Sequence, residues 1–552
     1  MYKTISIGTD DFKKIIESNS LYIDKTLFIK DIIDNTDEVI LFPRPRRFGK
    51  TLNMSMLSYY FDNTLESNNL FKGLEITKCG KLYLKEMNKY PVIYLTLKEC
   101  KKNTYEEFIV HYKTLILDLY SKYKFILNSP KIEKAYKEYF NRCLEKTENI
   151  ELSSAISNLS KMLEKYYNEK VIVLLDEYDA PIIESYLSGY YDKCINFIKE
   201  VFSSTFKNNL SLKKGVITGI LRISKEGLFS GANNIKIYNI TDARFSNSFG
   251  FTELEVKECL KLYDIENKYK EVKKWYDGYL FEKEIIYNPW SILNFLSDEN
   301  HELKPYWVNT GGVDLLKNLI YNVNNTVMLE EYHKLLDNGY IEHVNIDLYM
   351  DLNNLDNSPS TIWTLFMLAG YLTPTKYFGT YNDITLRIPN KEIKYNLESV
   401  CVNWFKNNIK NSNLFENYFL NNNLEEFKNT FKKIVLTSFS YYDVDINQGE
   451  NFYHAFCMGL LYSGSNYFDI KSNRESGFGR YDLIITPKNN SCNYAYIIEF
   501  KAIELDNFNR TIKKALKQIN EKKYDSEFKG KYKVTKIAIV FKGKELKIEI
   551  RK

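Results

Sequence analysis

The sequence predicts a multidomain α/β protein, and three observations carry this prediction. An apolar run at 39–42 leads into Gly-Lys-Thr at 49–51 and then a helical stripe, which is a strand–loop–helix order. A second apolar run ends in two acidic residues at 171–177. Near the carboxyl terminus, the runs at 479–485 and 496–501 are rich in β-branched and aromatic residues and predict a hairpin, with a helical stretch after it.

We expect three structural parts, in line with a length of 552 residues, which favours roughly three or four units. Residues 1–285 form the predicted first α/β domain, 286–440 a mostly helical middle region, and 441–552 the second α/β domain. The Asn-rich stretches at 353–359 and 421–423 are the best candidates for domain boundaries. The helical middle is a candidate lever between the two ends of the chain.

The segment between the first apolar run and its helix has the composition of a phosphate-binding loop. Gly49 lets backbone amides approach a phosphate, Lys50 reaches the β- and γ-phosphate oxygens, and the hydroxyl of Thr51 binds Mg²⁺ at the positive end of the helix. The usual pattern G-x-x-x-x-G-K-[ST] places its first glycine where this chain has Arg44. We expect ATP to bind here, and this departure leaves binding without turnover open.

Three arginines stand in this loop: Arg44, Arg46 and Arg47. Their guanidinium groups either bind phosphates where the missing glycine's loop geometry would have done so, or pair with nearby acids and fix the loop. We favour phosphate contact for all three, which makes them candidate nucleotide-binding residues.

The second apolar run ends in Asp176 and Glu177, which is the form of a Walker B strand. In this role Asp176 sits behind the Mg²⁺ ion, and Glu177 orients or deprotonates the attacking water. The alternative is a buried parallel strand that ends in a polar loop. We favour the catalytic interpretation because the glycine-lysine-threonine loop and the acidic pair occur in the order that a nucleotide site requires.

The hairpin near the carboxyl terminus carries Asp482, Glu499 and Lys501. Glu499 and Lys501 point to the same face because side chains alternate along a strand. If Asp482 meets them across the pair, two carboxylates and an ammonium share one small volume, and Mg²⁺ relieves the repulsion between the carboxylates. A metal-bound water beside a lysine suits phosphodiester hydrolysis. The alternative is a surface hairpin with ordinary charges.

Composition narrows the classes of protein. The net charge is +5, but residues 501–552 hold sixteen Lys/Arg and seven Asp/Glu, so this segment carries +9 and the rest −4. A basic segment suits a polyanion, although a solvated lysine-rich surface gives the same count. The eight cysteines lack metal-ligand spacing, which argues against a zinc protein. Their pattern also favours a protein of the reducing cytoplasm. We expect neither a signal peptide nor a membrane span, since no apolar run reaches about eighteen residues.

Further motifs resemble known families. Most of residues 1–400 resembles the AAA-ATPase-like family, and about 445–552 resembles the PD-(D/E)xK nuclease superfamily, which implies a restriction-endonuclease-like fold. The motifs of the first resemblance are Tyr22-Ile23-Asp24-Lys25-Thr26, residues 44–51, Asp176-Glu177-Tyr178-Asp179, Phe249-Gly250-Phe251-Thr252-Glu253, residues 275–279 and residues 287–290.

The nuclease resemblance implies roles for individual residues. Asp482 and Glu499 would hold the metal ion, and Lys501 would position or polarise the water. His454 stands where the superfamily often has an acidic residue, which leaves its role open between a site residue and a core histidine. Gln518 matches a polar position on the helix that follows.

Two more candidates follow the apolar strand predicted at 215–220. Thr218 is a candidate sensor of the γ-phosphate, and Arg222 would face the nucleotide in its own chain or across a subunit interface. An ordinary strand end is the alternative for both residues.

These observations predict an ATP-binding protein, with ATPase activity, coupled to a Mg²⁺-dependent nuclease. Nucleic acid is the expected substrate, with DNA favoured over RNA by analogy with the superfamily, in defence or in mobile-element processing. The alternative is a nucleotide-controlled switch whose carboxyl-terminal domain binds nucleic acid or protein without cleaving. A translocating motor ranks last because no helicase motif set is visible. We expect a cytoplasmic protein, and a homo-oligomer is left open.

Overall fold

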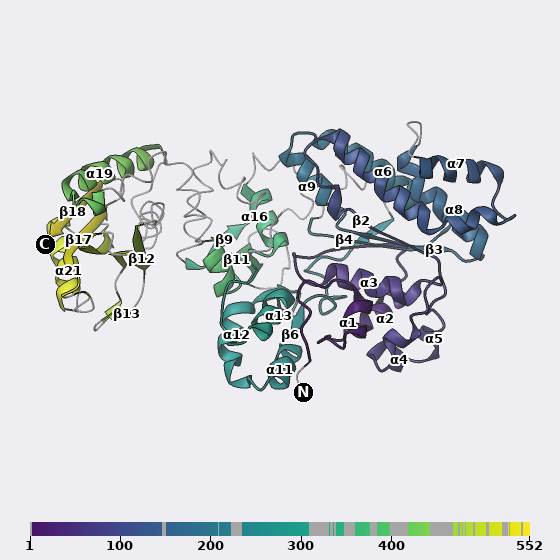
Figure 1. Ribbon diagram of the computed structural model, residues 1–552, viewed down its shortest axis with the longest axis horizontal. Coiled ribbons are helices and arrows are strands. Elements are labelled where there is room, and N and C mark those ends of the chain that lie inside the picture. The colour runs from purple at the N-terminus through teal and green to yellow at the C-terminus, as the bar shows by residue number, and fades with distance from the viewer. Residues whose placement is uncertain are drawn as a thin grey trace. The chain divides into compact units, whose positions relative to one another are not determined.

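The computed structural model divides the chain into two compact units, which are described separately (Figure 1). The first unit comprises residues 1–315 and 342–393, and the second comprises 316–341 and 394–552. The structure describes residues 3–145, 151–207, 209–221, 234–307, 331, 335, 338–346, 359–375, 384–397, 418–441, 467–472, 475–476, 479–480, 482–488, 492–503, 507–521, 528, 530–542 and 545–552.

The first unit is built around a parallel five-stranded sheet of order β2-β3-β4-β1-β5. Its central strands β1 and β3 are buried along their whole length, because helices cover both faces of the sheet, and this explains their unbroken apolar runs. The strands are β1 (Val39–Pro43), β2 (Val92–Thr96), β3 (Val171–Asp176), β4 (Leu212–Gly219) and β5 (Ile235–Ile237). All of their carboxyl ends meet at one edge, where ligands bind in such sheets.

Helices lie on both faces of this sheet, with α1–α3 on one side and α6, α8 and α9 on the other (Figure 1). They are α1 (Phe12–Glu17), α2 (Leu27–Asp34), α3 (Lys50–Phe61), α4 (Glu75–Lys78), α5 (Lys81–Leu84), α6 (Tyr105–Lys122), α7 (Lys134–Glu145), α8 (Ala155–Tyr167), α9 (Ala180–Leu187) and α10 (Tyr191–Phe202). Short 3₁₀ turns include η1 (Asn68–Phe71) and η2 (Lys98–Cys100), which directly follows β2.

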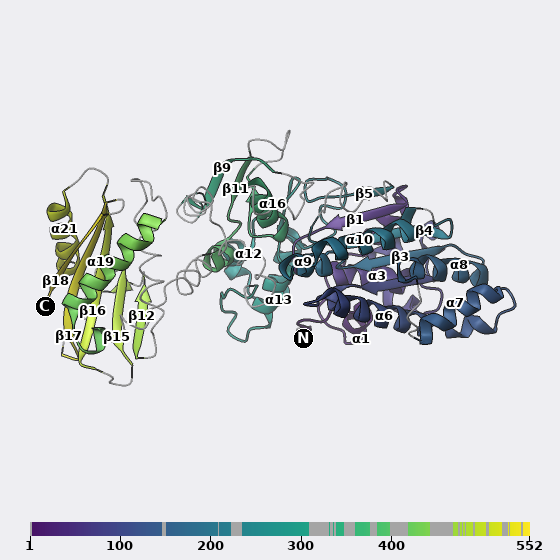
Figure 2. The same cartoon turned by 90° about the horizontal axis from the view of Figure 1, so that it is seen from above.

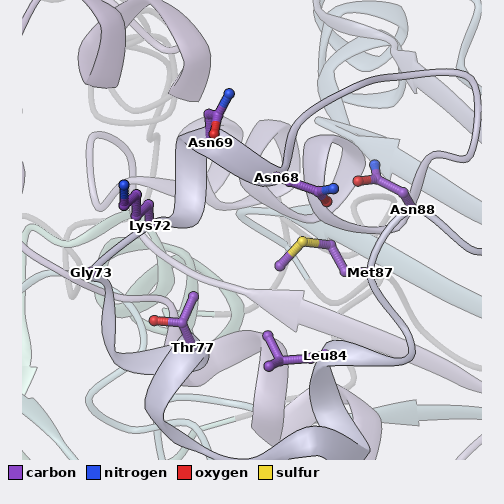
Figure 3. A pocket seen from close by; sticks show the side chains of 8 residues that line it. All are labelled: Asn68, Asn69, Lys72, Gly73, Thr77, Leu84, Met87 and Asn88. Carbon is purple, nitrogen blue, oxygen red and sulfur yellow. The ribbon is translucent and has the colours of Figure 1, made fainter.

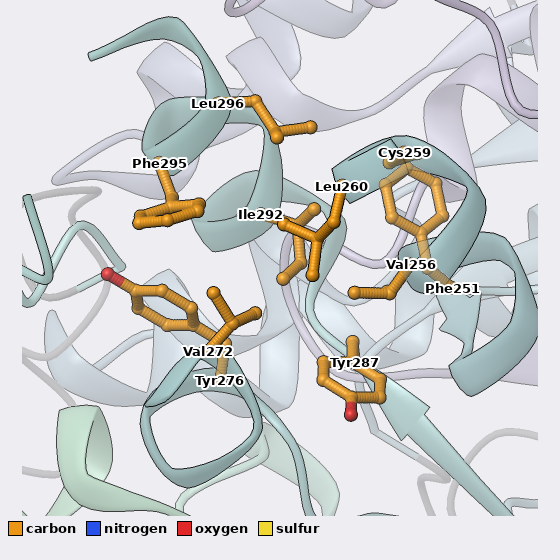
Figure 4. Close-up of a cluster of buried hydrophobic side chains, with 10 residues drawn as sticks. All are labelled: Phe251, Val256, Cys259, Leu260, Val272, Tyr276, Tyr287, Ile292, Phe295 and Leu296. Atoms are coloured by element: carbon orange, nitrogen blue, oxygen red, sulfur yellow. The ribbon is translucent and has the colours of Figure 1, made fainter. Parts of the chain in front are cut away.

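A small subdomain at residues 251–306 packs beside the sheet. It contains the strands β6 (Phe251–Thr252), β7 (Tyr279–Phe281) and β8 (Glu284–Tyr287) and the helices α11 (Glu253–Leu262), α12 (Tyr269–Tyr276) and α13 (Pro289–Ser297). Ten buried side chains from these elements form its core (Figure 4). The amino-terminal arm, through Ile5, Leu21 and Ile23, packs against the same core.

The segment predicted as mostly helical also contains strands. A three-stranded sheet of order β10-β11-β9 is formed by β9 (Tyr340–Val344), which precedes α16 (Pro359–Ala369), and by β10 (Thr373–Pro374) and β11 (Ile384–Arg387), which follow it. These strands are two to five residues long, and β11, which alternates buried and half-buried residues, spans only four positions, so their sequence gives little signal for a strand. The division at residues 285 and 440 stays a prediction.

The second unit contains a mixed five-stranded sheet of order β12-β15-β16-β17-β18. Its strands are β12 (Phe468–Ser472), β15 (Leu483–Pro487), β16 (Tyr494–Ala502), β17 (Lys533–Lys542) and β18 (Glu545–Arg551); β13 (Glu475–Ser476) and β14 (Gly479–Arg480) form a separate pair. β16 and β17 are parallel and joined by α21 (Phe508–Glu521), which packs on one face of the sheet. α19 (Leu424–Tyr441) lies against this sheet as well (Figure 2).

The two α/β domains confirm the fold class that the sequence predicts, with a parallel sheet at the amino-terminal end and a mixed sheet at the carboxyl-terminal end. Among the described residues, the helices are all too short or too polar to span a lipid bilayer.

Candidate active sites

The phosphate-binding loop predicted at residues 44–51 connects β1 to α3. β1 ends at Pro43 and α3 begins at Lys50, so the loop lies at the carboxyl edge of the sheet. Gly49 precedes the helix with φ 83°, a left-handed conformation that glycine adopts without strain. The space beside the Gly49 Cα is open, and Gly49, Lys50 and Thr51 line a cleft, which is where a helix amino terminus binds a phosphate.

Lys50 is turned back onto its own loop. Its Nζ donates to the carbonyl oxygens of Arg44 at 2.9 Å and Pro45 at 2.8 Å. Burial lowers the pKa of Lys50, and the negative charge of Glu177 opposes that shift. Two carbonyl dipoles are weaker partners for a buried ammonium than a phosphate is, so Lys50 is prepared to exchange them for an anion.

Asp176 holds together the residues predicted for the magnesium site. Its Oδ2 accepts a hydrogen bond from Thr51 Oγ1 at 2.7 Å, and its Oδ1 accepts one from Thr218 Oγ1. Burial raises the pKa of this carboxyl, and both hydroxyl bonds oppose the shift. A hydroxyl oxygen beside a carboxylate is the donor set that P-loop proteins offer to Mg²⁺, so these residues fit the ion. The candidate sensor Thr218 therefore shares a carboxylate with Thr51.

Glu177 directly follows Asp176 in the chain and lines a cleft that residues of the phosphate-binding loop also line. Its φ is 49°, a left-handed conformation that is strained for glutamate. Asp179 stabilises the turn, because its Oδ2 accepts the backbone amides of Ile220 at 2.7 Å and Leu221 at 2.8 Å, just beyond β4. The turn after β3 is thus tied to the end of β4, and Glu177 is held at the edge of the cleft.

The cleft has a volume of about 370 Å³ and two kinds of lining. One wall is apolar and comes from the amino-terminal arm and the small subdomain: Ile5, Leu21, Ile23, Phe251, Trp290 and Leu293. The other part is charged and contains Arg46, Arg47, Lys98, Lys101 and Glu177. An apolar wall beside a cationic region suits an amphipathic anion such as a nucleotide.

The three loop arginines have different positions. Arg46 and Arg47 line the cleft, and the guanidinium carbon of Arg47 lies 4.2 Å from the centre of the Trp290 ring. Arg44 does not line the cleft. It is fully buried and donates to the carbonyl oxygens of Pro43 at 2.9 Å and Tyr238 at 2.7 Å. The expected phosphate contact of Arg44 is therefore corrected, because a nucleotide in the cleft would not reach its guanidinium group.

Several cleft residues were not predicted from the sequence. Lys98 and Lys101 come from the segment after β2, and Thr96 at the end of β2 pairs with Asp176 of β3. Their position follows from strand order, which local patterns do not contain. Trp290 ends the family motif at residues 287–290, to which the sequence assigns no contact with a nucleotide. Lys25, which the family motif includes, joins the arm to α11 through a 2.7 Å ion pair with Glu255.

Strand alternation puts Glu499 and Lys501 on one face of β16, and Asp482 lies directly before β15. Ile484 and Ile497 pack against α21. Asp482 is two positions before Ile484, and Glu499 is two positions after Ile497, so strand alternation predicts that each acidic side chain faces the same side of the sheet as its isoleucine. Asp482 precedes Leu483, which pairs with Ile498, so Asp482 is placed opposite Glu499. The Oδ2 of Asp482 accepts the amide of Phe500 at 2.8 Å.

Glu499 is fully buried, and its Oε1 lies 3.2 Å from the Nζ of Lys501, which is partly exposed. Two carboxylates with a lysine at the exposed end fit Mg²⁺, which one or two protein carboxylates hold together with substrate phosphates. Among the described residues, no group of three or more His, Cys, Asp and Glu side chains is close enough to enclose a metal ion. Gln518 is half-buried on α21, and its role stays a prediction. The candidates His454 and Arg222 lie outside the described residues.

A second hollow, of about 530 Å³, lies near η1, α4 and α5 (Figure 3). Its lining consists of the amides Asn68, Asn69 and Asn88 with Lys72 and several small or aliphatic residues. It lacks the paired charges of the cleft at Gly49, and we assign it no role.

Comparison with known proteins finds a family match at each end of the chain. A family model described as a predicted AAA-ATPase matches residues 6–229, and one for the PD-(D/E)XK nuclease superfamily matches residues 448–550. The chain is also 23% identical to an uncharacterized protein in the vnfD 5′ region of Azotobacter chroococcum mcd 1, over 541 residues that cover 96% of this chain and 94% of that protein. The chain therefore carries an amino-terminal region that matches the predicted AAA-ATPase family and a carboxyl-terminal region that matches the PD-(D/E)XK nuclease superfamily.

Proposed function

We propose that this protein binds and hydrolyses ATP with Mg²⁺ in the cleft at Gly49, and cleaves DNA at Asp482, Glu499 and Lys501. The observation that carries the ATPase half is the 2.7 Å bond between Thr51 and Asp176, with Glu177 beside it at the cleft. The observation that carries the nuclease half is the 3.2 Å contact between Glu499 and Lys501, with Asp482 bonded to the amide of Phe500 between them.

In the proposed ATPase site, Lys50 leaves the carbonyls of Arg44 and Pro45 and binds the β- and γ-phosphates. Thr51 and Asp176 hold Mg²⁺, which neutralises charge on the phosphate oxygens when it is bound. Glu177 orients the attacking water and accepts its proton as the water oxygen bonds to the γ-phosphorus, the bond from that phosphorus to the bridging oxygen breaks, and ADP leaves. Arg46 adds positive charge beside the phosphates, and the apolar wall around Trp290 takes the nucleobase.

In the proposed nuclease site, Asp482 and Glu499 hold Mg²⁺, which supplies an activated water and charge neutralisation at the scissile phosphate. Lys501 lies at the exposed end of this pair and is positioned to orient the water or to stabilise the phosphate's developing charge. The amide of Phe500 fixes the orientation of Asp482, because it donates to the carboxylate of that residue.

The surface of α21 supports a polyanionic substrate. One side of this helix is buried against the sheet through Ile512, Ala515 and Leu516. The opposite side exposes four cationic residues: Arg510, Lys513, Lys514 and Lys517. A cationic helix face next to a candidate phosphodiesterase site complements the phosphate backbone of nucleic acid.

The test is nicking of supercoiled plasmid DNA in the presence of Mg²⁺, with and without ATP. Glu499→Gln and Lys501→Met keep side-chain size and remove the proposed ligand and cation, so each should lower the rate by about 10²–10⁴-fold. Lys533→Met, at the start of β17, is the matched control, because Lys533 is exposed and lies away from Lys501 in the strand register. It should nick at the wild-type rate.

Nicking that survives both Glu499→Gln and Lys501→Met would come from a contaminating enzyme and would refute the nuclease proposal. DNA binding without any nicking by the wild-type protein would favour the nucleotide-controlled switch instead. The same assay on single-stranded RNA tests the choice of DNA as substrate, and Lys50→Met with ATP tests whether the nucleotide controls cleavage.

A further inference from the structure

The loop at residues 44–51 is held in place by its surroundings rather than by glycine at its start. The Arg44 side chain donates to the carbonyls of Pro43, Tyr238 and Phe245, and its backbone amide donates to the carbonyl of Gly219 at 3.0 Å. At the other end, the amide of Gly250 donates to the carbonyl of Phe48 at 3.1 Å. The loop is therefore fixed at both ends by residues from outside it.

The middle of the loop is held from a third direction. Trp307 donates its indole Nε1–H to the carbonyl of Arg46 at 3.4 Å, and only 4% of its surface is exposed. Gly370, at the end of α16, leaves room for Pro45, because a Cβ atom built on Gly370 would lie 2.9 Å from Pro45 Cβ. Both contacts come from segments that follow the small subdomain.

Trp307 is itself anchored by a buried carboxylate. The Oε1 of Glu392 accepts the backbone amide of Trp307 at 2.7 Å, and its Oε2 accepts Ser291 Oγ at 2.7 Å. Glu392 and Ser291 are both fully buried. The indole of Trp307 also packs edge-on against Tyr371, with ring centres 4.8 Å apart.

We propose that Trp307 and Glu392 are positioning residues for the phosphate-binding loop: Glu392 fixes the backbone at Trp307, and Trp307 fixes the carbonyl of Arg46. Lys50 donates to the carbonyls of Arg44 and Pro45. The carbonyl of Arg46 is the next one along the loop, and it needs a different donor. With that donor in place, the loop amides are pre-organised before a phosphate arrives. Neither residue touches the phosphates.

The nucleotide part of this inference rests on the proposed ATP site, and the experiment separates the two. Titration calorimetry with Mg²⁺-ATP gives the dissociation constant, and backbone amide exchange over residues 46–49 reports loop order in the free protein. Trp307→Phe removes the indole donor and keeps an aromatic ring. Because Trp307→Phe loses one weak hydrogen bond, its dissociation constant for Mg²⁺-ATP should rise roughly two- to fivefold, and amide exchange in the loop should be faster.

Two further variants separate positioning from general stability. Trp363→Phe changes an equally buried tryptophan in α16 and should leave the dissociation constant and loop exchange at wild-type values. Glu392→Gln retains an acceptor for the Trp307 amide and should behave as wild type, whereas Glu392→Leu should loosen the loop as Trp307→Phe does. Wild-type loop exchange in Trp307→Phe and Glu392→Leu would overturn the inference. Absence of ATP binding in the wild-type protein would refute the proposed ATP site and leave the exchange result to decide the positioning role.

Discussion

Arg44→Gly restores the glycine that the usual phosphate-loop pattern has at this position, and it gives the sharpest test of what Arg44 does. In the structure the guanidinium group is fully buried, and its carbon lies 5.1 Å from the centre of the Phe249 ring. Burial lowers the pKa of Arg44 to about 9, so the side chain stays charged at neutral pH. Its hydrogen bonds to Pro43 and Tyr238 are 2.9 and 2.7 Å long.

The expected loss of stability follows from these contacts. Removing the side chain leaves the buried carbonyls of Pro43, Tyr238 and Phe245 without this donor, at about 1–3 kcal/mol each, and part of this is recovered if water enters. Glycine adds roughly 0.5–1 kcal/mol of backbone entropy. We therefore expect Arg44→Gly to lower the free energy of unfolding of the first unit by about 3–5 kcal/mol.

The assay is urea unfolding of the full chain, followed by tryptophan fluorescence and far-ultraviolet circular dichroism, with ATP affinity measured in parallel. Arg44→Met keeps much of the volume but has no donors, so it should also destabilise. A protein that loses ATP affinity while its unfolding transition stays at the wild-type urea concentration would refute the structural role and reinstate Arg44 as a phosphate ligand.

Three other predictions concern the sites and the packing around them. Thr51→Val removes the hydroxyl that donates to Asp176 and should lower Mg²⁺-dependent ATP turnover by more than tenfold, whereas Thr51→Ser should retain it; equal rates in a phosphate-release assay would contradict the magnesium role. Burial raises the pKa of Glu392 from 4.5 to about 7, so between these pH values the folded state holds a proton that the unfolded state has lost. The free energy of unfolding should therefore fall by about 3 kcal/mol as the pH rises from 4.5 to 7. Glu392→Gln should flatten that part of a stability–pH curve, and an unchanged slope would show that another group is responsible. Gly250→Ala should lower the melting temperature, because its Cβ would lie 2.2 Å from Ile286 Cγ2 at a φ of +81°; an unchanged melting temperature would contradict this packing.

Local sequence patterns predict the parts of each site that lie on one element. Lys50 and Thr51 begin the helix that the strand–loop–helix order predicts, and Asp176 ends the strand that the apolar run predicts. The shared face of Glu499 and Lys501 follows from strand alternation alone. These features need only the two periodicities of secondary structure and the order of the elements along the chain.

The remaining features depend on residues far apart in the sequence. The phosphate contact expected for Arg44 is wrong because its partner Tyr238 is 194 positions away, and no local pattern indicates that pairing. Lys98 enters the cleft because β2 is placed beside β3. Trp307 reaches Arg46 across 261 positions. Strand order and long-range packing determine these contacts, and a single sequence contains no direct signal for either.

The most direct test of the account is the affinity of the full-length protein for Mg²⁺-ATP, compared between the wild type and Lys50→Met by titration calorimetry. The account predicts saturable binding of one nucleotide per chain, and at least tenfold weaker binding when the ammonium that exchanges carbonyls for phosphate is absent. Equal affinity in the two proteins would contradict it, because the nucleotide would then bind somewhere other than the loop between β1 and α3.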